Sequence, residues 1–264
     1  MTIVACLKWV SHPGEPDDER FSGMSPADQA ALEFALQQAD STGDEVVAVT
    51  LGPPGAERVL RDALACGAHR ALRIDAPVAT PGHQVAAAIA HHVAGAAWVW
   101  CGDHSLDLGA GSVPAFLAAH LGAEQALGVI QVRIGDGSVQ ATRRLDGGYR
   151  ELLAVRAPAV VSVEGATARL RRASLPSVRA AAAAVVDVVP PAVPSAPEEF
   201  VVRPYRPRAR ALPPPGGSSP LERLRALTDA GAAAAARGEQ ITLAPHEAAA
   251  RIVQALREWG HLGG

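Results

Sequence analysis

Short apolar runs alternate with segments of helical periodicity through the first hundred residues of this chain. The apolar runs have the length and composition of parallel strands that are buried on both faces, and they lie at 2–10, 45–52, 70–75 and 96–102. Before the first helical segment, Ser25 and Pro26 provide an N-cap and a first helical position. This alternation predicts an α/β fold, a parallel twisted sheet with helices on both faces.

The pattern changes after residue 122. Apolar and polar residues alternate from 127 to 163, and the sequences GDGS and DGGY interrupt this alternation at positions typical of hairpin turns. These features predict antiparallel strands that are added to the parallel sheet. The basic segment 164–180 that follows has the composition of a solvated loop.

The C-terminal third differs from the rest of the chain in composition. Prolines recur from Pro190 to Pro220 at a density that strands and helices do not tolerate. Beyond them, Ala248, Ile252, Leu256 and Trp259 form one apolar stripe at helical spacing. We therefore expect an α/β domain at 1–187, a proline-rich extended arm at 188–220, and a helical segment at 221–264 that packs on the domain or on a partner.

Charge and cysteine content exclude several classes of protein. With 24 basic and 27 acidic residues the net charge is -3, too low in basic residues for a nucleic-acid surface. Cys6, Cys66 and Cys101 lie in apolar runs without metal-binding spacing, which indicates reduced core thiols and no metal site. No run reaches the roughly 18 apolar residues of a membrane span. These features predict a cytoplasmic protein.

The sequence GDHSLDLGAGSVPAF, which begins at Gly102, combines a strand end, a glycine-rich loop and a helix start. Such an arrangement predicts an anion site, because backbone N–H groups and the helix N-terminus both favour negative charge. In open parallel sheets the ligand lies beyond the carboxyl ends of the strands, where this loop is placed. The loop lacks GxGxxG and GxxxxGK[ST], so dinucleotide and triphosphatase sites are not indicated, whereas an adenine mononucleotide site remains open.

A hydrolytic site in the same loop is a weaker alternative. His104, Ser105 and Asp107 are residue types found in nucleophilic catalysis. The chain has no GxSxG elbow, and no separate His–Asp pair has a spacing that supports this chemistry. His91 and His92, on a predicted helix, are expected to face solvent.

Several motifs in one order resemble the electron transfer flavoprotein β-subunit family. The stretch QATRRLDGGYRELLAVRAPAVVSV at 140–163 is similar to the family signature, in which a basic residue precedes Asp-Gly-Gly and a later proline. Other similar segments are VACLKWV at 4–10, SPADQAALEFAL at 25–36, the run at 51–75, the glycine loop with its helix, and ASLPSVRAA at 173–181. The resemblance covers about 2–183.

The resemblance implies an electron carrier rather than a catalyst, with an adenine nucleotide α hydrolase-like fold. Family members are αβ heterodimers in which the α subunit holds most of the FAD and the β subunit holds a structural AMP. Electrons arrive from flavin-dependent dehydrogenases, which bind the recognition loop, and pass to a membrane quinone oxidoreductase. The similarity therefore predicts a β subunit that delivers electrons toward the respiratory quinone pool.

The resemblance also implies site residues. For the AMP site they are Cys6, Ser25, Pro26, Ala27, Asp28, Leu51, Gly102, Asp103, His104, Ser105, Leu106, Asp107, Leu108, Gly109, Ala110, Gly111, Ser112 and Val113. In the recognition loop 164–180, Leu175 is the apolar anchor for a dehydrogenase, with Arg171, Arg172 and Arg179 as charges around it.

The glycine loop departs from the family pattern at three positions. Gly109, Ala110 and Ser112 stand where the family has Asp, Asn and Gln, which predicts fewer polar side-chain contacts to the nucleotide.

Two alternatives to a bound AMP and an electron carrier stay open. In some electron-bifurcating members of the family, a second FAD binds in this region. A universal-stress-type nucleotide-binding protein shares the sheet and the glycine loop but transfers no electrons. The tail LAPHEAAARIVQALREWGHL resembles that of the variant associated with the mycofactocin redox system of actinobacteria.

Overall fold

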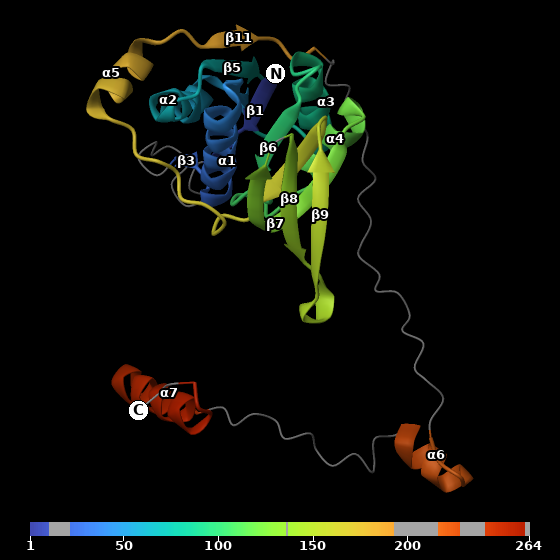
Figure 1. Ribbon diagram of the computed structural model, residues 1–264. Coiled ribbons are helices and arrows are strands. Elements are labelled where there is room, and N and C mark those ends of the chain that lie inside the picture. Colours follow the sequence, from blue (N-terminus) through green and yellow to red (C-terminus); the bar gives the residue numbers. More distant parts are fainter. Residues whose placement is uncertain (11–21, 136, 193–215, 228–240, 262–264) are drawn as a thin grey trace. The chain divides into compact units, whose positions relative to one another are not determined.

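The computed structural model describes residues 1–10, 22–135, 137–192, 216–227 and 241–261 (Figure 1). The chain divides into two units, Met1–Glu198 and Glu199–Gly264. The first unit contains one large sheet with helices on both sides, which confirms the predicted α/β fold.

The large sheet has nine strands in the order β11-β5-β4-β1-β6-β10-β7-β8-β9. Six of them run parallel as neighbours from β11 to β10, and β7 joins them in parallel along its first half. The strands are β1 (Thr2–Cys6), β4 (Glu45–Gly52), β5 (Arg70–Asp75), β6 (Trp98–Gly102), β7 (Glu124–Gly135), β8 (Ser138–Arg144), β9 (Arg150–Arg156), β10 (Ala159–Val163) and β11 (Asp187–Val189). A separate two-stranded ribbon pairs β2 (Trp9–Val10) with β3 (Gly23–Met24).

Each face of the parallel sheet is covered by a pair of helices. Strand residues alternate between the two hydrophobic clusters, so that in β1 Ile3 and Ala5 contact one helix pair and Val4 and Cys6 the other. The first pair is α1 (Pro26–Thr42) and α2 (Glu57–Cys66), and the second is α3 (Gly82–His92) and α4 (Val113–Leu121). Because both faces are covered, the central strands β1, β6 and β10 are nearly continuous apolar runs rather than alternating ones.

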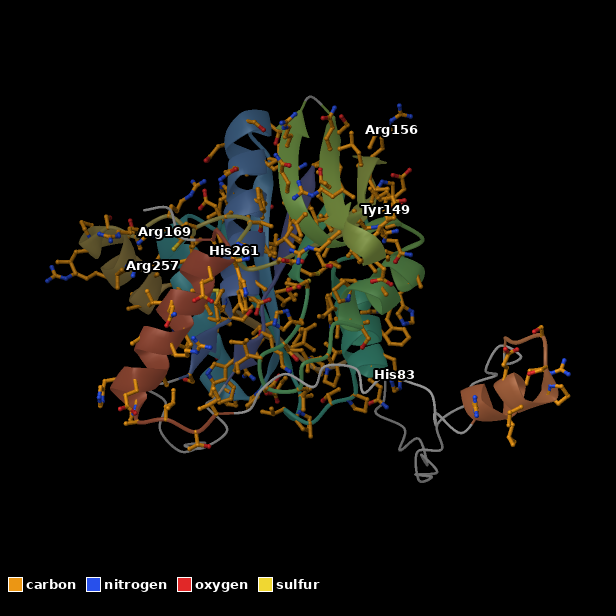
Figure 2. The ribbon with its side chains drawn as sticks, turned by 90° about the horizontal axis from the view of Figure 1, so that it is seen from below. His83, Tyr149, Arg156, Arg169, Arg257 and His261 are labelled. Atoms are coloured by element: carbon orange, nitrogen blue, oxygen red, sulfur yellow. The ribbon has the colours of Figure 1, made fainter. Side chains whose placement is uncertain are left out.

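The predicted antiparallel extension is present, with one difference in its topology. Strands β7, β8 and β9 pair antiparallel in sequence, and the Asp-Gly-Gly turn η3 (Asp146–Gly148) connects the last two. Strand β10, which the sequence pattern groups with this meander, instead inserts parallel between β6 and β7. All five of its residues are buried, as in an interior strand that is covered on both faces. Figure 2 shows Tyr149 and Arg156 on this extension, well apart from Arg169, which precedes α5.

The segment after β10 returns to the other edge of the sheet. Residues 164–174 pass over α1 and lead to α5 (Leu175–Ala183), which packs against α2. The chain then adds β11 beside β5, so the sheet includes two residues beyond the expected boundary at 187. The sequence pattern predicted neither α5 nor β11. Ser174, however, caps α5 by accepting a hydrogen bond from the Ser177 N–H, a start signal visible in the sequence SLPS.

The second unit contains two helices, α6 (Pro220–Leu227) and α7 (Pro245–Glu258), in the segment expected to be helical. Ile252 and Trp259 of the predicted apolar stripe are exposed. Most of the proline-rich arm, 193–215, lies outside the described residues. Among the helices of the described ranges, none has the length and apolar character that crossing a membrane requires.

Candidate functional site

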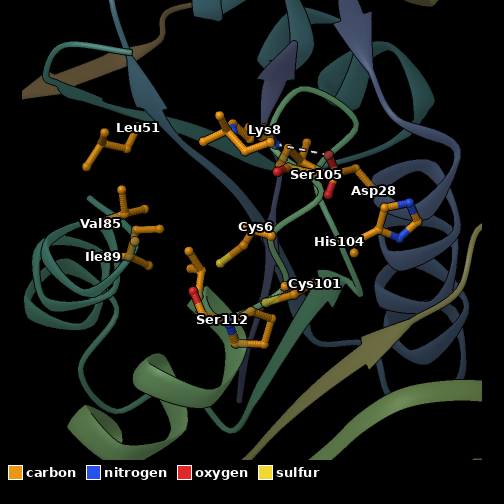
Figure 3. A pocket seen from close by; sticks show the side chains of 18 of the residues that line it. Cys6, Lys8, Asp28, Leu51, Val85, Ile89, Cys101, His104, Ser105 and Ser112 are labelled. Atoms are coloured by element: carbon orange, nitrogen blue, oxygen red, sulfur yellow. Dashed lines mark hydrogen bonds between the residues drawn. The ribbon is translucent and has the colours of Figure 1, made fainter. Parts of the chain in front are cut away.

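A pocket opens where the strand order of the sheet reverses. From β1 the chain builds outward through β4 and β5, and then crosses back to place β6 on the other side of β1. The connections that leave β1 and β6 therefore diverge, and a crevice forms beyond their carboxyl ends. Cys6, Leu7 and Lys8 from the first strand end and Cys101 and Gly102 from the second line this pocket, a cavity of about 170 Å³ (Figure 3).

Asp28, in the first turn of α1, joins these two strand ends. Its Oδ2 accepts a hydrogen bond from the Lys8 N–H at 3.2 Å, and the carboxylate also accepts one from the backbone of Gly102. The N-cap Ser25 binds the Asp28 N–H through Oγ at 3.0 Å, which fixes the first turn of the helix. An added Cβ on Gly102 would lie 2.7 Å from Asp28 Oδ1, so only glycine allows this approach.

Burial raises the pKa of Asp28 from 3.8 to about 6, although the hydrogen bonds from Lys8, Ser25 and Gly102 partly oppose this rise. The folded state thus binds a proton more tightly than the unfolded state, and this stabilisation is lost as the pH rises through the folded pKa. Relative to Asp28→Asn, the wild type should lose about 2 kcal/mol of unfolding free energy between about pH 4.5 and 7. Urea unfolding of both proteins at each pH measures this difference, and a pH-independent difference would contradict it.

The glycine-rich loop between β6 and α4 is closed by its own backbone. The Ser105 N–H donates to Ala110 O at 3.0 Å, and the Gly109 N–H donates to Ser105 O at 2.8 Å. Gly109 has a φ of +61°, in the left-handed region. A Cβ on Gly111 would lie 2.1 Å from Asp103 O, so the loop closes this tightly only with glycine at this position.

Lys8 and Asp107 connect this loop to β1. Lys8 Nζ lies 2.8 Å from the Asp107 carboxylate, and both side chains are partly buried. Burial alone would raise the pKa of Asp107, but the hydrogen bonds from Lys8 and the Leu108 N–H and the Lys8 charge outweigh it and hold the pKa below its usual value. The ion pair thus fixes the loop over the carboxyl end of the sheet.

The N-terminus of α4 faces the pocket. Its N-cap Ser112 makes no side-chain capping bond, and Gly111, Ser112, Val113 and Pro114 all line the cavity. The first turn of a helix carries partial positive charge on backbone N–H groups that have no intrahelical partner. Gly82 of α3 lies opposite, where an added Cβ would be 3.1 Å from Ser112 Oγ. This end of the pocket is suited to an anionic group.

The pocket gathers most of the predicted nucleotide-site residues. Those that line it are Cys6, Asp28, Leu51, Gly102, His104, Ser105, Leu108, Ala110, Gly111, Ser112 and Val113. The remaining ones do not line it and instead support it or lie beside it: Ser25, Pro26, Ala27, Asp103, Leu106, Asp107 and Gly109. Of these, Ser25 caps α1, Asp107 pairs with Lys8, and Leu106 lines a second hollow beside β3.

One wall of the pocket was not predicted. The segment after β5 and the first turns of α3 supply a largely apolar surface made by Val78, Thr80, Gly82, Val85 and Ile89. Figure 3 shows Val85 and Ile89 on this wall, beside the predicted Leu51 of β4 and opposite His104 and Asp28. Because β5 is parallel to β1 and β6, its carboxyl end lies at the same edge of the sheet. The placement rule that identified the glycine loop also applies to this segment.

The residues considered for a hydrolytic site have other partners. His104 Nδ1 lies 2.7 Å from Asp103 Oδ1, Asp107 binds Lys8, and the buried Ser105 hydroxyl has no hydrogen-bond partner among the described residues. Serine, histidine and a carboxylate therefore do not form the nucleophile, base and orienting chain that hydrolytic catalysis requires. His91 is exposed, as expected, and His92 is half-buried.

Arg171 of the predicted recognition loop is bound to α1. Its guanidinium makes two bonds of 3.1 Å to the Glu33 carboxylate and one ion pair of 2.9 Å with Asp40, and its backbone N–H donates to Glu33 Oε2 at 3.0 Å. Burial acts to raise the pKa of Glu33, but the contacts with Arg171 and Gln37 hold it below the usual value. Arg171 thus anchors the loop to the helix that begins beside the pocket.

The other recognition-loop residues are exposed. Leu175 is 64% exposed at the start of α5, and Val178, one turn further on, is also exposed, so the two form a small apolar patch. Arg172 and Arg179 are exposed as well. At the other end of α5, Arg61 of α2 donates to the carbonyl oxygens of Ala181, Ala182 and Ala184, which fixes the helix C-terminus.

Fold and pocket define an α/β protein that has an anion-favouring cavity at the switch point of a parallel sheet. Residues 17–194 match the family model described as the electron transfer flavoprotein domain. The chain belongs to the electron transfer flavoprotein family.

Named relatives place the chain beside the β subunits of this family. It is 33% identical over 176 residues to protein FixA of Bradyrhizobium diazoefficiens, covering 62% of this chain and 61% of the relative. It is 29% identical over 178 residues to the electron transfer flavoprotein subunit beta of Clostridium acetobutylicum, covering 61% and 68%. The bovine subunit beta is 27% identical over 173 residues, covering 63% and 68%. The matched region thus spans about three fifths of the FixA relative.

Proposed function

We propose that this chain is the β subunit of a heterodimeric electron transfer flavoprotein, an electron carrier that is not a catalyst on its own. Family membership and the similarity to named β subunits support this proposal. In it, an α subunit contributes most of the binding site for FAD. Flavin-dependent dehydrogenases deliver the electrons, which pass to a membrane quinone oxidoreductase and the quinone pool.

The second part of the proposal is that the pocket binds an AMP, which stabilises the structure. The open first turn of α4 offers N–H groups to a phosphate, and the glycine loop leaves the backbone accessible beside it. The apolar wall of Leu51, Val85 and Ile89 offers a surface for an adenine ring. Because most of these contacts involve backbone or apolar groups, they tolerate Gly109, Ala110 and Ser112 in place of the polar side chains of the family.

The electron-carrying group has to come from a cofactor. Amino-acid side chains do not supply the reversible two-electron chemistry that a flavin provides. Within this chain, the proposal assigns the pocket to the nucleotide and the exposed face of α5 to the electron donor. A site for FAD then forms only together with the α subunit.

The test identifies what each form of the protein carries. The chain is purified alone and after co-expression with the candidate α subunit, both samples are denatured, and the released nucleotides are identified by mass spectrometry. We expect AMP from the single chain, and FAD with its visible absorption only from the pair. A colourless homodimer that releases ATP and takes up no partner would favour a universal-stress-type protein, and FAD in the single chain would favour the second-FAD alternative.

The role of α5 has its own test. Leu175→Ala removes an exposed apolar side chain that lies 64% accessible on the first turn of α5. Because anchor residues dominate binding energy, the rate of flavin reduction by the matching dehydrogenase should fall about tenfold or more. The flavin content and unfolding midpoint should stay unchanged. Stopped-flow reduction measures the effect, and an unchanged rate would reject this role for Leu175.

A further inference from the structure

Two cysteines form a pair at the floor of the pocket. Cys6 ends β1 and Cys101 lies near the end of β6, and the two are register partners across the parallel pair. Neighbouring strands are separated by about 4.8 Å, and paired residues of parallel strands point to the same face. Both side chains belong to the hydrophobic cluster on the α3 and α4 side of the sheet.

Both thiols also face the cavity. Cys6 is 8% exposed and Cys101 4% exposed, and each lines the pocket. Figure 3 shows the two sulfur atoms near each other and close to Ser112 at the N-terminus of α4. The neighbouring Cys6 thiol, burial and the Asp28 carboxylate raise the pKa of the Cys101 thiol, so this thiol is protonated before an ion binds. An ion that enters the pocket can reach both sulfur atoms without a change in the sheet.

The number and type of ligands restrict what the pair could bind. Among the described residues, no group of three or more His, Cys, Asp or Glu side chains is arranged to hold a metal ion. Zinc in structural sites takes four protein ligands and in catalytic sites three, so two thiols are too few for it. A soft monovalent ion prefers sulfur and accepts low coordination numbers, and Cu(I) is the biological ion with these properties.

We propose that Cys6 and Cys101 form a two-thiolate site for Cu(I) at the floor of the nucleotide pocket. On binding, each sulfur releases a proton to solvent and forms one bond to the ion, and no electron is transferred. This inference goes beyond the electron-carrier function and does not depend on it, because the ligands are both in this chain. Copper at this site occupies part of the space assigned to the nucleotide.

Copper binding is measured on the full chain, purified without nucleotide, under anaerobic conditions. Cu(I) is added as its acetonitrile complex in competition with the chromogenic chelator bicinchoninate. The wild type should retain about one ion per chain, and Cys6→Ser and Cys101→Ser should each weaken binding by about a hundredfold or more. Cys66→Ser is the matched control, since that thiol is half-buried on α2 and contacts Arg171 O instead.

X-ray absorption of the copper-loaded wild type tests the geometry without a variant, so a variant that fails to fold does not decide the result. Two sulfur neighbours and no further ligand are expected. Retention of copper by the Cys6→Ser/Cys101→Ser double variant, loss of it in Cys66→Ser, or three or more ligands in the absorption spectrum would each overturn the proposal.

Discussion

Arg171→Ala should be among the most destabilising single changes outside the hydrophobic core, at about 3 kcal/mol of unfolding free energy. The change leaves the Glu33 carboxylate, whose side chain is only 8% exposed, with its cationic partner gone and Gln37 as its remaining side-chain donor. A buried charge that has lost its partner costs more than the ion pair contributed. Because Glu33 lies on α1 and Arg171 precedes α5, the change also releases the segment that leads to Leu175.

Three measurements separate anchoring from a direct role in partner binding. Urea unfolding gives the stability, and hydrogen exchange of 172–183 reports whether the loop detaches. The matched control, Arg172→Ala, removes an exposed arginine next in sequence and should change neither quantity by more than about 0.5 kcal/mol. If Arg171→Ala leaves stability and exchange at the wild-type level, the ion pair does not hold the loop.

The pH dependence of this effect follows from the sign of the Glu33 shift. The pKa of Glu33 lies below its ordinary value of 4.5 because of its contacts with Arg171 and Gln37. The ion pair therefore stabilises the fold above the unfolded pKa, and this contribution is lost as the pH falls through the folded pKa. The difference between wild type and Arg171→Ala should shrink in acid, and the same unfolding series at low pH measures it.

Gly111→Ala should abolish nucleotide binding, with an affinity loss of at least about a hundredfold. The new Cβ would lie 2.1 Å from Asp103 O, a distance that no packing adjustment of a side chain relieves, because the obstacle is backbone. The loop has to open, which moves the Ser105–Ala110 backbone bond and the first turn of α4 together. We expect a global stability loss of about 1–3 kcal/mol in addition.

Calorimetric titration of AMP into the nucleotide-free protein measures the effect on the pocket. Gly23→Ala is the matched control, because an added Cβ there has no atom within 4 Å and the position lies outside the nucleotide pocket. That variant should bind like the wild type. Wild-type affinity in Gly111→Ala would show that the loop does not form part of the nucleotide site.

Several parts of the fold were predictable because their signals are local. Ser25 and Pro26 begin α1, Gly43 and Gly67 end α1 and α2 as C-caps, and the apolar run of β4 matches its predicted range of 45–52. The glycine loop after β6 and its place at the sheet edge follow from the strand pattern and the position of Gly109 and Gly111 in the chain. These features need only neighbouring residues or the general rule for parallel sheets.

Other parts depended on contacts between distant segments. Strand β10 has the same short apolar run whether it joins a meander or inserts between β6 and β7, and only its burial on both faces distinguishes the two. Strand β11 has three residues and one partner, β5, which is too little periodicity to detect. In the sequence, Arg171 is one of several arginines in a basic loop. Only the folded structure shows that Glu33 and Asp40 of α1 lie beside it.

The sequence by itself determined the α/β class, the order of the parallel strands along the chain, the helix starts and the family resemblance, because each depends on local patterns of apolar residues, caps and glycines. Tertiary structure alone decided which side chains share the pocket and what charge they carry. Three properties depend on residues from separate segments of the chain: the burial that raises the pKa of Asp28, the Lys8–Asp107 ion pair and the Cys6–Cys101 register pairing. Burial and distance set these properties, and both exist only after the chain has folded.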